Sequence, residues 1–135
     1  MSIPTHEDAK LMVELFKLRL DPYLQESENW FTTQFEPGSW EELKKRYPVS
    51  SREWRMLNTV LGYWEMLGAL IDQNLLSEDL LFDAMEGMEI TWAKVKEWLP
   101  SARSEVGPDL WENIEVLATR QQKWRSARLP KSQRA

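Results

Sequence analysis

The chain has 135 residues, of which 42% are hydrophobic and 29% are charged, and its formal net charge is −5. A chain of this length forms one domain that buries about two-thirds of the surface its unfolded form exposes. The sequence contains no cysteine, which excludes disulfides, cysteine-ligated iron–sulfur clusters, thiol catalysis and thiolate zinc sites.

The composition and the placement of the prolines indicate an all-α fold. Leucine and methionine outnumber the strand-forming residues valine, isoleucine and threonine, and no stretch alternates apolar and polar residues with a period of two. Every proline stands where a helix can begin or end. We therefore predict an irregular bundle of about six or seven helices around a central helix near residues 52–74.

The first two helices are predicted from their caps. Thr5 can cap a helix that runs to about Leu20, and Asp21-Pro22 can start a second helix that runs to about Phe35. A kinked continuation of the first helix is the alternative. The apolar spacing predicts the inner stripe of the first helix, formed by Ala9, Met12, Val13, Phe16 and Leu20.

A short third helix and the central helix follow. Ser39 and Glu42 have capping-box spacing for a helix that ends just before the next proline. The glycines of the central helix, Gly62 and Gly68, are unfavourable in a helix interior, so we expect them to allow the close approach of a neighbouring helix. The central helix is apolar over most of its circumference, through Trp54, Leu57, Leu61, Trp64, Leu67, Gly68 and Ile71.

Three further helices complete the predicted bundle. Ser77 can cap a short helix that Gly87 ends or bends, and the next helix carries apolar residues from Met88 to Leu99. The Gly107-Pro108-Asp109 sequence is expected to start the last helix. The predicted inner stripe of this last helix is Leu110, Trp111, Ile114, Leu117, Ala118 and Gln121.

Charges are distributed unevenly along the chain. All 22 acidic residues stand at or before Glu115, whereas six of the 17 basic residues follow it. Order is expected to fade after Trp124, because Leu129 is the only large apolar residue beyond it. The sequence thus predicts one helical domain over residues 1–124 and a basic, flexible tail over residues 125–135.

The sequence shows no recognisable catalytic, metal or cofactor constellation. Di-iron and di-manganese bundles need Glu-x-x-His pairs, and the single histidine, His6, has no glutamate three residues before it. The lack of cysteine and of further histidines removes the nucleophilic triads, and the five scattered glycines form no phosphate-binding loop. We expect no cofactor, metal or catalytic residue, which argues against an enzyme without excluding one.

The first candidate for a polar site is a line of Asn58, Glu65 and Asp72 along the central helix. At about 100° per residue these side chains fall on one side of the helix, near Trp64. Glu65 can be a buried acid with a raised pKa, suited to proton transfer or to a cationic ligand. The favoured alternative is structural: Glu65 accepts an indole or tyrosine hydrogen bond or pairs with an arginine. The candidate arginines are Arg19, Arg46 and Arg103.

The basic end of the chain is the second candidate. Nucleic acid or an anionic membrane can bind such a segment by counterion release, although the acidic body would repel a phosphate backbone. The segment can also dock on another copy of the chain or remain solvated. The residues predicted for an interaction are Trp124, Arg120, Lys123, Arg125 and Arg128.

Neither a secretory signal nor a membrane span is predicted. Residues 1–10 lack the apolar region of a signal peptide. The longest nearly apolar run, residues 60–71, contains Glu65 and is too short to cross a bilayer. Together with the absence of cysteine, these features favour a cytoplasmic location.

Four groups of residues occur in a recognisable order: Asn29-Trp30-Phe31 with Phe35, then Leu61-Gly62-Tyr63-Trp64-Glu65-Met66, then Leu80-Leu81-Phe82-Asp83, and then Trp92-Ala93-Lys94. Together they resemble an uncharacterised family of small bacterial helical proteins known only as a domain of unknown function. The resemblance covers roughly residues 9–117. It implies a bacterial origin and an all-helical fold, and it assigns no site.

The sequence-based expectation is a non-catalytic protein-interaction module, which can include self-association. It follows from the missing catalytic constellations, the excess of large aromatic residues and the uneven charge. One alternative is a small-ligand sensor or unusual enzyme with its polar site around Glu65. The other is nucleic-acid binding through the basic tail.

Overall fold

The computed structural model describes residues 3–134. In that range it contains eight α-helices, one short 3-10 helix and no strand, which confirms the all-α prediction. The elements in chain order are α1 (His6–Arg19), α2 (Pro22–Thr33), α3 (Trp40–Arg46), α4 (Arg52–Asp72), α5 (Glu78–Ala84), α6 (Met88–Ala93), α7 (Leu99–Val106), α8 (Glu112–Ser126) and η1 (Lys131–Gln133).

Most helices begin at caps that lie next to them in the sequence. Thr5 and Ser39 complete capping boxes with the acidic residues three positions later. Asp21, Ser51 and Ser77 accept hydrogen bonds from the first backbone N–H groups of α2, α4 and α5. Because Asp21 caps its own helix, α1 and α2 are separate helices and not one kinked helix.

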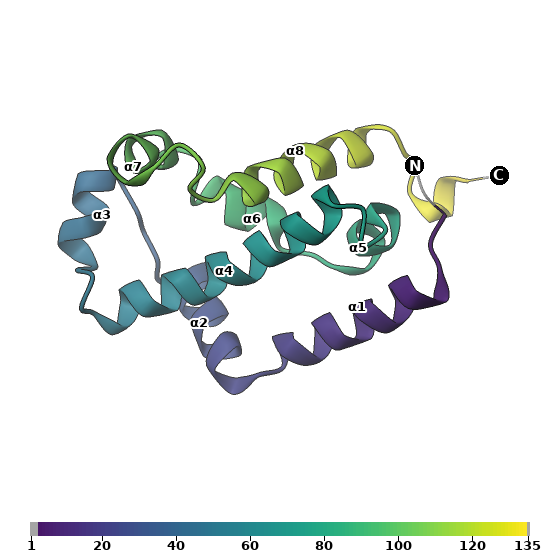
Figure 1. Ribbon diagram of the computed structural model, residues 1–135, viewed down its shortest axis with the longest axis horizontal. Helices are drawn as coiled ribbons and strands as arrows, with labels where there is room; N and C mark the ends of the chain where they lie inside the picture. Colours follow the sequence, from purple (N-terminus) through teal and green to yellow (C-terminus); the bar gives the residue numbers. More distant parts are fainter. Residues whose placement is uncertain (1–2, 135) are drawn as a thin grey trace.

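The long helix α4 runs through the middle of the molecule, with α8 along one side of it (Figure 1). α2 packs against another side of α4, and α5 and α6 both pack on α8. A helix that is apolar around most of its circumference is covered by several neighbours, as predicted for this segment. The buried residues of α4 are Met56, Leu57, Val60, Leu61, Tyr63, Trp64, Leu67, Gly68 and Ile71.

α8 comes very close to α4 at Gly68. A Cβ at this position would lie 2.1 Å from the carbonyl oxygen of Asn113, a separation that side-chain carbons do not reach. The predicted close approach is therefore confirmed for Gly68. It is wrong for Gly62, which is exposed and whose Cβ would have no atom of another helix within 4 Å.

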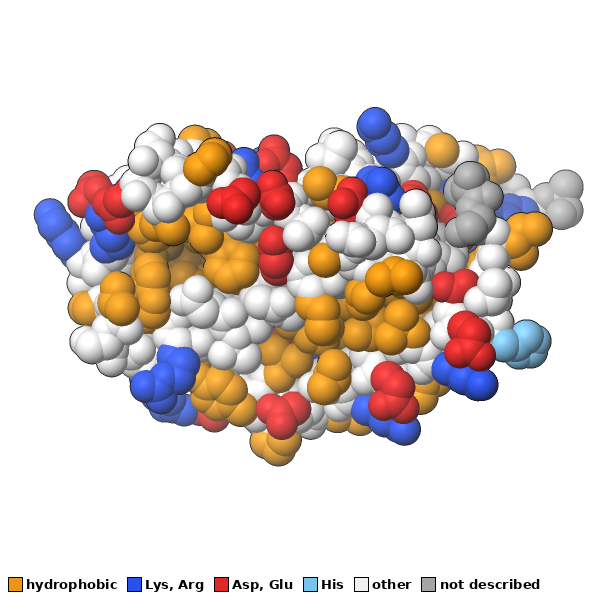
Figure 2. Space-filling view, viewed as in Figure 1, with side chains coloured by type: hydrophobic (Ala, Val, Ile, Leu, Met, Phe, Trp, Pro, Cys, Tyr) orange, Lys and Arg blue, Asp and Glu red, His pale blue; other side chains and the backbone are white. Residues whose placement is uncertain are grey.

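The predicted inner stripe of α1 is confirmed only at Met12, which is buried together with Leu15, a residue that the prediction did not include. The other predicted residues are exposed: Ala9, Val13, Phe16 and Leu20. The reason is that α1 lies at the edge of the bundle and packs mainly on α2 and α5, so one narrow stripe is enough to cover its contact. Figure 2 shows hydrophobic side chains gathered on this face of the molecule between α4 and α1.

The single helix predicted over residues 88–99 is divided into α6 and the start of α7. Between them, the indole Nε1 of Trp98 donates a hydrogen bond to the Lys94 carbonyl oxygen at 2.7 Å. Pro100 stands in the first turn of α7, where its missing N–H breaks no helical hydrogen bond. The last helix likewise begins at Glu112, later than predicted, because residues 107–111 form a turn.

The Trp-Ala-Lys motif holds the end of α2. The ammonium group of Lys94 donates hydrogen bonds to the carbonyl oxygens of Phe31 at 2.6 Å, Thr32 at 3.2 Å and Phe35 at 3.1 Å. A cation is favourable at a helix C-terminus, where carbonyl groups lack helical partners. Burial lowers the pKa of Lys94 from its usual value. The lysine thus fastens the segment after α6 to the end of α2.

The Tyr-Trp-Glu motif of α4 joins three other elements. The hydroxyl of Tyr63 donates a hydrogen bond to the Leu15 carbonyl oxygen of α1 at 2.9 Å. The ring of Trp64 lies against Gly87, the N-cap of α6, where a Cβ would lie 3.2 Å from the ring. Glu65 contacts the start of α8. Three consecutive side chains therefore fix three helices against α4.

Tyr63 is expected to titrate late in alkali. Burial raises its pKa from 10.0 to about 12. Because the folded state favours the neutral phenol, the stability it contributes is complete below pH 10.0 and is lost as the pH rises through about 12. Tyr63→Phe should remove this late step from the ultraviolet absorbance titration and lower the free energy of unfolding by about 1 kcal/mol. Persistence of the step in Tyr63→Phe, with its loss in Tyr23→Phe, would contradict this assignment.

Candidate functional site

The structure separates the three members of the predicted polar line on α4. Asn58 is exposed, and its side-chain amide donates a hydrogen bond to the Trp54 carbonyl oxygen of its own helix at 2.9 Å. Asp72 is exposed and lies 3.9 Å from Arg120. Only Glu65, between them, is partly buried. The three residues share one side of the helix without lining one site.

Glu65 acts as the cap of α8. Its Oε1 accepts a hydrogen bond from the backbone N–H of Ile114 at 3.0 Å, and its Oε2 accepts one from the Asn113 side-chain amide at 3.0 Å. The N-cap residue of α8 is Trp111, whose side chain has no acceptor and whose φ is 53°. The carboxylate of Glu65 on α4 thus supplies the hydrogen-bond acceptor that the N-cap residue of α8 lacks. This partner differs from the arginines, indoles and tyrosines considered for Glu65.

Trp64 is a core residue with a cation on its ring. Its exposed fraction is 3%, and its ring meets that of Tyr63 edge to face at 5.9 Å. The Arg19 guanidinium lies 5.2 Å from the ring centroid and also pairs with Glu28 at 3.2 Å. The Trp64 ring is therefore occupied by groups of its own chain.

Four of the five residues predicted at the basic end contact acidic groups of the same chain. The indole of Trp124 donates to Asp79 at 2.7 Å, and Arg128 covers the Trp124 ring at 4.2 Å from its centroid. Lys123 is exposed and forms no ion pair with any residue from 3 to 134. The ion pairs of the arginines are Arg120 with Glu78, Arg125 with Glu89, and Arg128 with Asp83.

Part of the predicted tail is folded onto α5. α8 continues to Ser126, and η1 follows it at residues 131–133. Lys131 lies 2.8 Å from Asp83, and this hydrogen bond lowers the pKa of the Asp83 carboxyl group below its usual value. The uneven charge in the sequence is therefore partly neutralised within the molecule, because the basic end meets the acidic face of α5.

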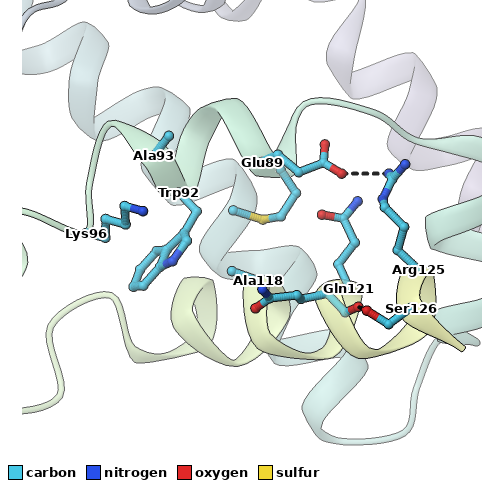
Figure 3. A pocket seen from close by; sticks show the side chains of 10 residues that line it. Glu89, Trp92, Ala93, Lys96, Ala118, Gln121, Arg125 and Ser126 are labelled. Carbon is cyan, nitrogen blue, oxygen red and sulfur yellow. Dashed lines mark hydrogen bonds and ion pairs between the residues drawn. The ribbon is translucent and has the colours of Figure 1, made fainter.

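A groove that the sequence did not predict lies between α6 and α8. Its volume is about 450 Å³, within the range of small-molecule sites. Figure 3 shows Trp92 and Lys96 at one end, the ion pair of Glu89 and Arg125 at the other, and Gln121 between them. The residues that line this α6–α8 groove are Met88, Glu89, Trp92, Ala93, Lys96, Ala118, Gln121, Gln122, Arg125 and Ser126.

Gln121 is the unusual residue of the α6–α8 groove. Only 2% of it is exposed, yet its side-chain Nε2 forms no hydrogen bond with any residue that the structure describes. A buried amide without a partner costs about 1–3 kcal/mol, and such groups are rare. The sequence carried one signal for it, since Gln121 is the polar member of the otherwise apolar stripe of α8.

The residues that line the α6–α8 groove carry a small net positive charge. Glu89 and Arg125 form an ion pair of 2.6 Å with both side chains more than half exposed. The ammonium group of Lys96 has no ion pair within residues 3–134 and is exposed. One cation is thus left uncompensated at the end of the groove where the partly buried indole of Trp92 lies (Figure 3).

The described part of the chain has neither a metal site nor a membrane-spanning helix. Among residues 3–134, no three histidine, cysteine, aspartate or glutamate side chains are placed to hold a metal ion together. In the same range, no helix combines the length and the apolar composition needed to cross a membrane.

The molecule is a small all-α bundle built around one central helix, with a groove between α6 and α8. Residues 4–124 match the family model described as Domain of unknown function (DUF4760). The chain therefore belongs to this family, as its sequence motifs indicated. No curated protein and no solved structure matches the chain.

Proposed function

We propose that the protein is a non-catalytic binding module whose ligand enters the α6–α8 groove. The observation that carries this proposal is the side chain of Gln121, which is 2% exposed, lines the groove and has an unpaired Nε2. A bound ligand that accepts one hydrogen bond would remove the cost of burying this amide.

The chemistry of the groove favours binding over catalysis. Its one carboxylate, Glu89, forms an ion pair with Arg125 and is exposed. General acid–base catalysis uses groups whose pKa is tuned by burial or by close charges. Tyr63 and Lys94, whose pKa values burial shifts, lie outside the groove and hold helices together.

The basic end of the chain supports the nucleic-acid alternative less well. Affinity for nucleic acid depends on cations that can neutralise phosphates and release counterions. Arg120, Arg125 and Arg128 are each within 4.0 Å of an acidic side chain of the same molecule. A phosphate backbone would have to compete with these internal pairs.

Filling the groove tests the proposal. Ala118→Phe places a ring in the groove from α8, and Ala93→Phe does so from the exposed surface of α6. The matched control is Ala84→Phe, at an exposed position of α5 outside the groove. A library of small organic molecules is screened by NMR against each variant, after circular dichroism has shown that each variant is folded.

The expected result is a set of molecules that bind the wild type and Ala84→Phe and lose binding in both filled variants. Binding that survives in Ala118→Phe and Ala93→Phe would place the ligand elsewhere and overturn the proposal. A screen in which no molecule shifts the resonances of Trp92 or Gln121 would overturn it as well.

A further inference from the structure

We infer that the ligand of the α6–α8 groove is a small organic anion with a flat apolar ring. This inference rests on the proposed function and adds the chemical class of the ligand. It follows from three properties of the groove, which are its unpaired donor, its uncompensated charge and its apolar wall.

The unpaired donor favours a ligand that brings an acceptor. The Nε2 of Gln121 can donate hydrogen bonds only, and it is buried with no acceptor within reach in residues 3–134. A ligand that presents another N–H group there would leave two donors facing each other. Carboxylate oxygens are suited to the position, because hydrogen bonds to a charged acceptor are stronger than those to a neutral one.

The charge of the groove selects an anion over a cation. Lys96 and Arg125 contribute two positive charges, and Glu89 contributes one negative charge. Glu89 and Arg125 pair with each other in a solvent-exposed position, where such pairs contribute only about 0–1 kcal/mol. The guanidinium can therefore also turn toward an incoming anion, while the Lys96 ammonium adds attraction from the opposite end (Figure 3).

The wall of the groove suits a flat apolar group. Trp92 is only partly buried, and Figure 3 shows its indole at the end of the groove away from Arg125. Met88, Ala93 and Ala118 complete the apolar lining. An aromatic ring stacked on an indole gains about 0.5–1.5 kcal/mol beyond the area it buries. A ligand whose ring lies on Trp92 would extend its acid group toward Gln121, which stands between Trp92 and Arg125 in the groove (Figure 3).

Three probes of the same shape and different charge test the inference. They are 2-naphthoate, the neutral 2-naphthamide and the cation of 2-(aminomethyl)naphthalene. Dissociation constants are measured by NMR titration with the folded chain of 135 residues, following Trp92 and Gln121. We expect 2-naphthoate to bind about tenfold more tightly than the amide, with the cation weakest, because the groove discriminates by charge.

Variants locate the anion. Lys96→Met removes the uncompensated cation from an exposed position, and it should weaken 2-naphthoate about threefold or more while leaving 2-naphthamide unchanged. Lys45→Met, an exposed lysine of α3, is the control with the same change in net charge. Gln121→Met removes the donor and should weaken both probes.

The outcomes separate the inference from the function on which it rests. Equal affinity for the acid and the amide, with shifts at Trp92 and Gln121, would overturn the anion preference and leave the binding groove intact. Binding of 2-naphthoate that is the same in Lys96→Met and Lys45→Met would overturn the inference too. If none of the three probes shifts these resonances, the inference fails, and the filled variants decide separately on the groove.

Discussion

Gly68→Ala is expected to lower the free energy of unfolding by about 2–4 kcal/mol, because the added methyl group collides with backbone. Its Cβ would lie 2.1 Å from the Asn113 carbonyl oxygen and 2.6 Å from the carbonyl carbon. A flexible side chain could rotate away from such a contact, but the first turn of α8 has to move as a whole. That movement would also separate Glu65 from the N–H group it caps.

The matched control is Gly62→Ala in the same helix. Gly62 has open space around its Cβ position, so alanine should gain its helix propensity and raise the free energy of unfolding by up to about 1 kcal/mol. Urea denaturation followed by circular dichroism measures both variants. Changes in stability of the same size and direction for the two substitutions would contradict close packing at Gly68.

Helix starts were predictable where the cap lies beside the helix. Thr5, Asp21, Ser39 and Ser77 each bind backbone N–H groups within three residues of themselves, and such local patterns are visible in one sequence. The start of α8 was not predictable in this way. Its cap is Glu65, which lies 49 residues before Ile114 and is brought there only by the packing of α8 on α4.

The faces of α1 show a second limit of sequence reasoning. Met12 can share an apolar stripe with Leu15 or, as predicted, with Val13, Phe16 and Leu20. Periodicity alone allows both stripes and does not choose between them. The choice depends on α2 and α5, which pack on the side of Met12 and Leu15 and leave Val13, Phe16 and Leu20 exposed.

The candidate groove could not be predicted from the sequence, for a related reason. Gln121 was visible as a polar residue on the inner stripe of α8, and Trp92 was visible as an aromatic residue of the next predicted helix. Their juxtaposition depends on where α6 ends and how it crosses α8, and the sequence predicted a longer helix there. The residue types were therefore available, but their shared position was not.

The motifs that carry the family resemblance have structural roles in this molecule. Tyr63, Trp64 and Glu65 fix α1, α6 and α8 against α4, and Lys94 closes the end of α2. These contacts account for the Tyr-Trp-Glu and Trp-Ala-Lys motifs without a ligand. The groove uses other residues, such as Gln121 and Lys96, so a change of ligand need not disturb the framework.

Glu65 gives the second large effect, because two hydrogen bonds at the start of α8 depend on it. In Glu65→Met the methionine side chain has a similar size but accepts neither hydrogen bond. The variant should lower the free energy of unfolding by about 2–3 kcal/mol, because α8 loses both its cap and the negative charge at its N-terminus. Glu65→Gln keeps one acceptor for the Ile114 N–H and should lose about 1 kcal/mol. Glu97→Met, at an exposed position, should change stability by less than about 0.5 kcal/mol.

The same variants separate a structural Glu65 from a ligand-binding one. Glu65 contacts Asn113 and Ile114 and does not line the α6–α8 groove, so Glu65→Gln should bind 2-naphthoate as the wild type does while unfolding at a lower urea concentration. Asn113→Ala should remove part of the same stability, and combining it with Glu65→Met should cost less than the sum of the two single changes, since both delete one shared hydrogen bond. Strictly additive losses of stability would contradict the capping role of Glu65. A loss of 2-naphthoate binding in Glu65→Gln would instead indicate that the ligand binds near Glu65 on α4.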